Sequence, residues 1–406
     1  MSGKAVAALD AALHAVGIKP GGQARAEARD EAGTAPGAPT VASAHDGTMA
    51  ALTWRGKKDV RVAQTDALLR VSATAICGSD LHLYLHSMPG LRAGDVLGHE
   101  FMGVVEEVGD GVKTVKRARA RAAPTPSLRA WQVQEAMYGH ASGGFYGYSH
   151  LTGGYAGGQA DHVRVIMADA NCLVLPEGLS DLDAVLLTDI LPTAWHACEM
   201  GDVKKGDVVA IWGAGPVGLL TAHCAQHRGA GRVILIDSVP DRLAHAAAKL
   251  PGVETLDFGQ RDTLAALKEM TAGEPGRGPD VCIEAAGFHY AKSLLHKLEM
   301  AVQLETDSAD ILNELITACR KGGTISIVGV YVGFVNHFNV GAFMEKQLTM
   351  CGGQTPVRRR AAEQGARGAA KGYQMFNDKT DGCIKVVLRP GAAEAVTRAP
   401  APAPAH

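Results

Sequence analysis

The chain has 406 residues, of which 47% are hydrophobic, and its formal net charge is −2. This length and composition are typical of about two globular domains. The basic stretch at 116–121 has no interleaved aromatic residues and the apolar runs fall short of the roughly 18 residues of a membrane helix, so we expect a solvated loop there, no nucleic-acid partner and no membrane span.

The two ends of the chain differ in composition from its middle. Residues 1–48 mix Ala, Gly, Pro and both charge signs without sustained periodicity, and we expect a disordered extension there. The end of the chain alternates Ala and Pro, and we expect a flexible tail at 391–406.

From 49 to 197 the sequence shows short β-rich runs separated by Gly and Asp. Runs at 68–75, 103–108 and 160–166 predict an antiparallel, barrel-like domain, and residues 343–390, with a strand-like piece at 382–388, are expected to return and complete it. Glycine-rich segments at 143–148 and 153–158 are either a mobile loop or simple turns.

Residues 198–342 alternate strands with helix-length amphipathic stretches, for example 232–237 followed by 242–250. This pattern predicts a doubly wound parallel sheet. The expected fold is therefore α/β, with a parallel-sheet domain inserted into a β-rich domain.

A candidate metal site comes from Cys77 and from His99 with Glu100. A thiolate and an imidazole are typical zinc ligands, and a zinc ion with only three protein ligands keeps a position for water or substrate. The third ligand is open from the residues alone: Asp189, Cys172 and Cys198 compete, and Asp189 has the alternative role of capping a helix that enters at Thr193.

A glycine fingerprint follows the apolar strand at 208–212, in the sequence Gly213-Ala214-Gly215-Pro216-Val217-Gly218. Gly213 permits a tight turn, Gly215 lets the backbone approach a pyrophosphate, and Gly218 allows close helix packing. Asp237 ends the next strand, 24 positions after Gly213 (237 minus 213), near the spacing of roughly 20 expected for the acid that binds the adenosine ribose. Its carboxylate repels a 2′-phosphate, which favours NAD over NADP.

The eight cysteines are dispersed with no CxxC pair, and we expect no secretory leader in front of them. This usage favours a reducing compartment, and we expect a cytoplasmic location.

Together these stretches resemble the zinc-dependent medium-chain alcohol dehydrogenase family, in particular its formaldehyde-dehydrogenase-like branch, with a GroES-like catalytic domain and a Rossmann domain. The matching stretches are ATAICGSDLH at 73–82, GDVLGHE at 94–100, GYSH at 147–150 through QA at 159–160, LTDILPT at 187–193 and the glycine fingerprint. They cover most of residues 49–356, in family order.

The resemblance implies that Cys77, His99 and Asp189 hold one catalytic zinc, with Glu100 as a neighbour or alternate ligand. It places Arg242 over the adenine side of NAD and Val217, Gly78 and 353–355 near the cofactor. It also implies a homo-oligomer and a small alcohol or aldehyde hydrate as substrate.

Zinc lowers the pKa of bound water from 15.7 to about 7, and a bound alcohol should be acidified in the same way before it gives up hydride. Ser79 and His82 are candidates for relaying the proton to solvent. Their alternative roles are a turn cap and a surface residue.

Three segments depart from the family pattern. Family members carry four clustered cysteines between the GHE and GYSH segments, whereas this chain has none there, so no structural zinc is expected. The segments 62–66, 117–136 and 357–370 reflect either loss in this lineage or an error in the reading frame. An alternative function is therefore a catalytically impaired NAD-binding homologue. A zinc-free quinone reductase is disfavoured, because it would not need Cys77, His99 and Asp189 together.

Overall fold

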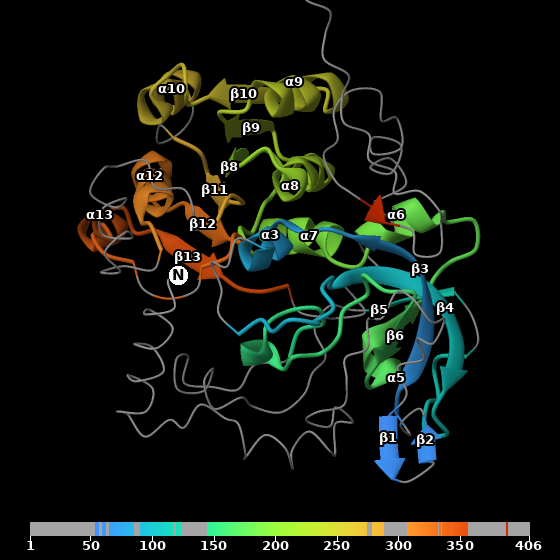
Figure 1. Cartoon of the computed structure of the whole chain (residues 1–406). Coiled ribbons are helices and arrows are strands. Elements are labelled where there is room, and N and C mark those ends of the chain that lie inside the picture. The colour runs from blue at the N-terminus through green and yellow to red at the C-terminus, as the bar shows by residue number, and fades with distance from the viewer. Residues whose placement is uncertain are drawn as a thin grey trace, which may run out of the picture. The chain divides into compact units, whose positions relative to one another are not determined.

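A computed structural model of the chain describes residues 53–56, 59–61, 65–84, 90–116, 119–122, 144–273, 278–287, 307–331, 333, 335–355 and 387–388 (Figure 1). They form two compact units, each with its own sheet: 53–189 together with 387–388, and 190–355. The predicted tails, 1–48 and 391–406, lie outside the described residues, as do 123–136 and 357–370. The predicted domain boundaries stay predictions.

The first unit is built on an antiparallel sheet whose strand order is β14-β3-β4-β5-β7, with β6 also pairing with β3. The strands are β3 (Ala67–Ala75), β4 (Glu100–Val108), β5 (Arg119–Ala122), β6 (His162–Val165), β7 (Cys172–Val174) and β14 (Val387–Leu388), beside a separate hairpin of β1 (Thr53–Gly56) and β2 (Asp59–Arg61). The helices are α3 (Gly78–Tyr84), η1 (His150–Thr152), α5 (Ala168–Asn171) and α6 (Asp181–Leu186). The core packs Leu69, Phe101 and Tyr146 with small aliphatic residues, and Cys172 belongs to it.

The structure corrects the prediction of a solvated loop in the basic stretch 116–121. Residues 119–122 are not a solvated loop but strand β5, which pairs with β4 on one side and β7 on the other. Its Arg-Ala-Arg-Ala sequence alternates with the period of two of a β-strand, and that periodicity, rather than charge, was the informative signal.

The second unit is a six-stranded parallel sheet, in the order β10-β9-β8-β11-β12-β13. The strands are β8 (Val208–Trp212), β9 (Arg232–Asp237), β10 (Val253–Asp257), β11 (Val281–Glu284), β12 (Thr324–Ile327) and β13 (Thr349–Gly352). The helices are α7 (Ile190–Met200), α8 (Pro216–His227), α9 (Pro240–Lys249), α10 (Thr263–Met270), α12 (Asp310–Ala318) and α13 (Val340–Glu345). Every residue of β8 is buried, as expected for a parallel strand covered on both faces.

This order is that of a doubly wound sheet made of two halves, β8 to β10 and β11 to β13, and the strand order reverses between β8 and β11. The predicted α/β fold class, with one antiparallel and one parallel sheet, is therefore confirmed. Among the described helices, none combines the length and hydropathy that crossing a bilayer requires.

Candidate metal centre and cofactor cradle

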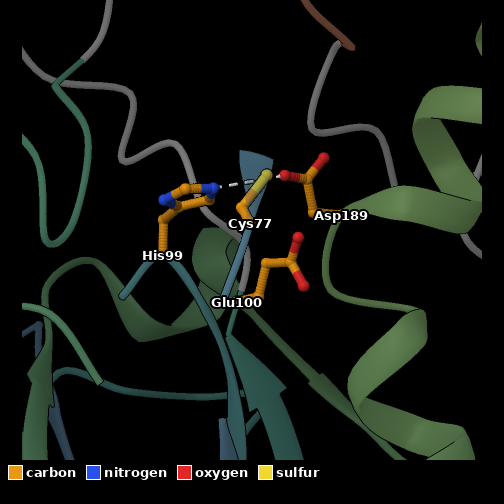
Figure 2. A group of neighbouring side chains, drawn as sticks. All are labelled: Cys77, His99, Glu100 and Asp189. Atoms are coloured by element: carbon orange, nitrogen blue, oxygen red, sulfur yellow. Dashed lines mark ion pairs between the residues drawn. The ribbon is translucent and has the colours of Figure 1, made fainter. Parts of the chain in front are cut away.

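Four side chains of the first unit converge on one point: Cys77, His99, Glu100 and Asp189. Each offers one ligand atom, and these atoms all lie within 4.8 Å of one another. Figure 2 shows the sulfur of Cys77, the imidazole of His99 and the carboxylate of Asp189 directed toward one another, with a dashed line for the ion pair between His99 and Asp189. The structure thus brings together the three predicted zinc ligands and Glu100.

Strand pairing explains why residues 22 positions apart in sequence (99 minus 77) meet in space. Ala75, at the end of β3, pairs with Glu100 at the start of β4, so Cys77 lies beside His99. Gly98 has a φ of +96°, and a side chain there would approach Gln159 to 2.6 Å. The backbone thus turns sharply just before His99 enters the cluster.

Asp189 lies in the turn directly before α7, which begins at Ile190 rather than at Thr193. The carboxylate Oδ2 is 3.5 Å from Nε2 of His99. A carboxylate at a helix N-terminus is favoured by the helix dipole, so the capping and ligand roles are compatible in this position.

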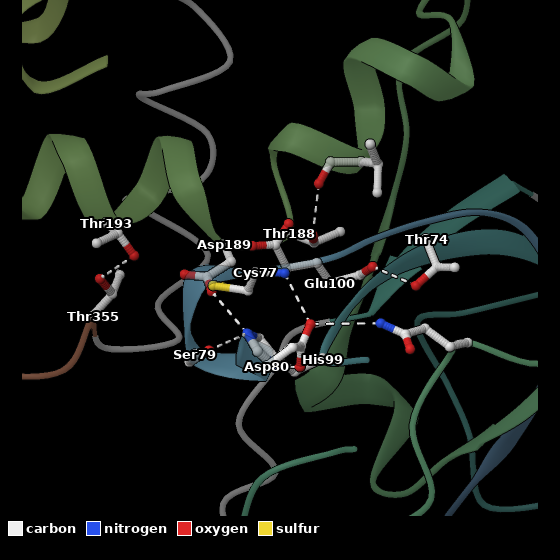
Figure 3. Close-up of polar contacts among 12 residues, drawn as sticks. Thr74, Cys77, Ser79, Asp80, His99, Glu100, Thr188, Asp189, Thr193 and Thr355 are labelled. Atoms are coloured by element: carbon white, nitrogen blue, oxygen red, sulfur yellow. Dashed lines mark hydrogen bonds and ion pairs between the residues drawn. The ribbon is translucent and has the colours of Figure 1, made fainter. Parts of the chain in front are cut away.

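Asp80 contacts both Cys77 and His99 and orients them, a role that could not be assigned from the sequence. Its Oδ2 accepts a hydrogen bond from the backbone N–H of Cys77 at 2.8 Å, and its Oδ1 lies 3.4 Å from Nδ1 of His99 (Figure 3). Metal-binding histidines commonly direct their second ring nitrogen at a carboxylate, which leaves Nε2 for the metal. The only sequence signal was an acidic residue in the first turn of α3.

The pocket stabilises positive charge. His99 is 6% exposed and Glu100 is fully buried. Burial lowers the pKa of His99, but the charge of Cys77 and hydrogen bonds with Asp189, Asp80 and Cys77 outweigh it, so its pKa is raised well above its ordinary value. A cluster of side chains with this charge suits a cation.

The donor set fits zinc. Thiolate, imidazole and carboxylate are the ligands that zinc takes, and bond lengths of about 2.0–2.3 Å put tetrahedral ligand atoms about 3.3–3.8 Å apart. The 3.5 Å between His99 Nε2 and Asp189 Oδ2 agrees with that spacing. Cys172 packs in the sheet core and Cys198 makes a contact of 3.5 Å with the carbonyl of Thr221, so neither belongs to this group.

Of the two relay candidates, Ser79 lies at the cluster. Its Oγ is 3.1 Å from Nε2 of His99, the same nitrogen that faces Asp189. His82 is on α3, but its side chain lies outside the described residues.

A glycine-rich loop at 144–159 packs against the segment that precedes His99. The N–H groups of Gly157, Gly158 and Gln159 donate to carbonyls of residues 96–98 at 2.8–3.0 Å. A side chain at Gly157 would come within 2.2 Å of the carbonyl of Leu97. Of the two interpretations left open above, the structure thus favours close-packed turns.

Tyr148, on the same loop, is a further residue that the sequence analysis did not single out. Its ring meets the ring of His99 edge-on, with centroids 6.1 Å apart. Burial, with smaller effects of nearby charges, raises the pKa of Tyr148 to about 12, so it stays protonated at neutral pH.

The glycine fingerprint forms a turn at the carboxyl end of β8. Gly213 has a φ of +104°, and a side chain at Gly218 would lie 1.8 Å from the carbonyl oxygen of Gly213. Gly215 caps α8, Pro216 and Val217 follow in its first turn, and nothing lies within 4 Å of the position where a side chain at Gly215 would begin. An open glycine at a helix N-terminus fits a pyrophosphate.

Asp237 ends β9 beside this turn and is 4% exposed. Its Oδ2 accepts from the N–H of Ala214 at 2.7 Å, and its Oδ1 accepts from the N–H groups of Ser238 and Val239 at 2.7 and 3.0 Å. Arg242 lies 3.5 Å from Oδ2. Asp237 therefore fixes the shape of the glycine turn, in addition to its predicted role as ribose acceptor. In the 353–355 segment, Thr355 hydrogen-bonds Thr193 at 3.0 Å.

Residues 63–177 match the family model described as the alcohol dehydrogenase GroES-like domain. A zinc-type alcohol dehydrogenase-like protein of Schizosaccharomyces pombe is 36% identical over 340 residues, which are 77% of this chain and 79% of that protein. A glutathione-independent formaldehyde dehydrogenase of Pseudomonas aeruginosa is 37% identical over 65% of this chain and 67% of its own length.

The solved structure of the alcohol dehydrogenase TADH from Thermus sp. ATN1 has a similar fold, with a TM-score of 0.65 and 30% identity over 81% of this chain and 93% of that one. Its fold agrees with the two units described above. The chain is therefore an oxidoreductase that belongs to the zinc-type alcohol dehydrogenase family.

Proposed function

We propose that this enzyme interconverts a small alcohol, or an aldehyde hydrate, and the corresponding carbonyl product, with one zinc ion and with NAD as the hydride carrier. The convergence of Cys77, His99 and Asp189 within 4.8 Å is the observation that supports it most directly. The cradle at 213–218 supports the cofactor part of the proposal.

When bound, zinc would polarise the oxygen of the alcohol and the nicotinamide would take up hydride. The chain's own part begins with Ser79, whose hydroxyl lies beside the metal-facing nitrogen of His99 and is placed to accept the substrate proton. His82 remains the proposed next carrier toward solvent. Asp80 holds the imidazole of His99 so that Nε2 stays directed at the cluster.

The preference for NAD rests on Asp237. A buried carboxylate beside the glycine turn can accept from a ribose hydroxyl but repels a 2′-phosphate. Arg242 is half-exposed and already lies beside the Asp237 carboxylate. The positive charge of Arg242 is therefore partly compensated by Asp237. A cytoplasmic location and a homo-oligomer are proposed on cysteine usage and family resemblance alone.

The test combines metal analysis of the purified full-length chain with a spectrophotometric screen of alcohols and aldehydes against NAD(H) and NADP(H). We expect one zinc per chain and turnover of a small alcohol or aldehyde with NAD. Cys77→Ser should lose zinc and turnover, whereas Cys224→Ser, a buried thiol on α8, should keep both.

Zinc-free protein that binds NADH and turns over no alcohol or aldehyde would instead indicate the impaired homologue. A lower Michaelis constant for NADP than for NAD would contradict the cofactor assignment.

A further inference from the structure

Glu284 lies where three loops of the second unit meet. It is the last residue of β11 and pairs across the sheet with Trp212 on one side and Ile327 on the other. Gly213 follows Trp212, and the loop at 328–331 follows Ile327. Glu284 is fully buried, although a buried carboxyl group is costly unless its surroundings compensate it.

The side chain and the backbone carbonyl of Glu284 each accept hydrogen bonds from a neighbouring loop. Its side-chain Oε1 accepts from the N–H groups of Ala286 and Gly287 at 2.8 and 2.6 Å, which closes a turn in which Gly287 has a φ of +87°. Its backbone carbonyl accepts from the N–H groups of Val328 and Gly329 at 3.1 and 3.2 Å. One residue therefore fixes the loops that follow β11 and β12.

The second carboxylate oxygen faces the 328–331 loop. A side chain at Gly329 would begin 2.0 Å from Oε2 of Glu284, so the carboxylate occupies the space beside that glycine. Oε2 is buried, and the N–H of Gly329 also interacts with this carboxylate. The hydroxyl of Tyr331 is buried and makes no hydrogen bond within the described part of the chain. Burial raises the pKa of Glu284, and burial with the charges of Glu284 and Asp307 raises the pKa of Tyr331.

The 284–287 loop and the glycine turn flank the point where the strand order reverses, between β8 and β11. A doubly wound sheet binds a dinucleotide across the point where its strand order reverses, with one nucleotide on each half. Asp237 belongs to the half that carries the adenosine, so the half made of β11 to β13 receives the nicotinamide. A side chain at Gly213 would come within 2.9 Å of the carbonyl of Ala285, which places the glycine turn against the turn that Glu284 closes.

We propose that Glu284 is a positioning residue for the nicotinamide half of the cofactor: it holds the 284–287 and 328–331 loops in the shape that binds that nucleotide. This inference rests on the proposed NAD dependence. Glu284 acts through the backbone of these loops and does not take part in hydride transfer.

The test compares the affinities for NADH and AMP in the full-length, zinc-loaded protein, by fluorescence for NADH and by calorimetry for AMP. Glu284→Ala should raise the Kd of NADH about tenfold and change the Kd of AMP by less than about twofold, because only NADH occupies the second half. Glu284→Gln keeps an oxygen for the two N–H groups and should raise the Kd of NADH by less than about threefold.

Gly329→Ala provides a second variant in case Glu284→Ala does not fold. It displaces the same carboxylate and should weaken NADH binding more than AMP binding. Gly352→Ala at the end of β13 meets only ordinary contacts, 3.6 Å or longer, and should leave both affinities unchanged.

The inference would be overturned if these variants lost as much affinity for AMP as for NADH. It would also be overturned if neither Glu284→Ala nor Gly329→Ala lost affinity for NADH. Both outcomes would leave the proposed function intact. Failure of the unmodified protein to bind NADH would reject the NAD dependence itself.

Discussion

At the scale of single residues, Asp189 is a proposed zinc ligand whose position also suits a helix cap. Its carboxylate lies 3.5 Å from His99 Nε2 and directly precedes α7. Asparagine caps helices as well as aspartate does but is a neutral and much weaker zinc ligand. Substitution by asparagine therefore separates the two roles.

We expect Asp189→Asn to leave the thermal midpoint of the metal-free protein nearly unchanged and to weaken zinc binding at least about 100-fold, measured by competition with a chromophoric chelator. Asp181→Asn, in the first turn of α6, serves as the matched control and should keep its zinc. Unchanged zinc affinity in Asp189→Asn would reduce Asp189 to a cap.

Asp169 offers a residue-level test of pH dependence. Its carboxylate accepts from the N–H groups of Lys113 and Thr114 and from the hydroxyl of Thr114, at 2.7–3.0 Å. Slight burial raises its pKa, but these hydrogen bonds outweigh that effect, so the pKa is lowered. A lowered folded-state pKa means that the contribution to stability is present above the unfolded pKa of about 3.9 and is lost as the pH falls through the folded value.

Asp169→Ala should therefore lower the urea midpoint of unfolding at pH 7, and the difference from the unmodified protein should shrink as the pH is lowered to about 3. Glu177→Ala, on an exposed residue of the same unit, should show no such pH-dependent difference. A difference that is constant between pH 7 and pH 3 would contradict the assignment.

At the scale of elements, the glycine turn between β8 and α8 separates packing from cofactor binding. A side chain at Gly218 would begin 1.8 Å from the carbonyl oxygen of Gly213, whereas one at Gly215 meets nothing within 4 Å. Gly215 also has a φ of −71°, which any residue adopts.

Gly218→Ala should therefore destabilise the protein by about 1–3 kcal/mol and weaken NADH binding together. Gly215→Ala should lower the free energy of unfolding by less than about 1 kcal/mol. It should still weaken NADH binding, because its methyl group enters the space where the pyrophosphate is proposed to bind. Thermal unfolding measures the stability of the two variants, and NADH fluorescence measures their affinity for the cofactor. Equal loss of stability in the two variants would contradict this account.

The strands could be predicted from the sequence where side-chain period and burial agree. The runs at 68–75 and 103–108 lie within β3 and β4, and the predicted strand at 232–237 has the same bounds as β9. Strand β5 was missed because its charges masked its period of two. Asp80 could not be assigned, because an acidic residue in a first helical turn has the same pattern whether it caps the helix or orients a histidine.

The pairing that forms the candidate site could not be derived from local patterns. Cys77 and His99 meet through the register of β3 and β4, and that register follows from sheet packing rather than from either segment alone. The contacts of Glu284 could not be predicted either, since its burial and its hydrogen bonds with two loops depend on the whole sheet.

At the scale of the whole molecule, the two kinds of binding group are segregated. The candidate zinc ligands belong to the unit made of 53–189, and the glycine turn with Asp237 belongs to the unit made of 190–355. Each unit has its own core. We therefore expect removal of the metal to leave the proposed adenosine site intact.

Treatment with 1,10-phenanthroline should therefore abolish turnover but change the Kd of AMP by less than about twofold, measured by calorimetry before and after metal removal. Added zinc should restore turnover. A large loss of AMP affinity in the metal-free protein would show that the two units are energetically coupled through the metal.

The short strand β14 has a consequence for biosynthesis. Val387 pairs with Ala75, two residues before Cys77, although 310 positions separate Val387 from that cysteine (387 minus 77). The ribosome makes the ligand-bearing segments long before this covering strand. The edge of β3 nearest Cys77 therefore stays open until the polypeptide has emerged past residue 388.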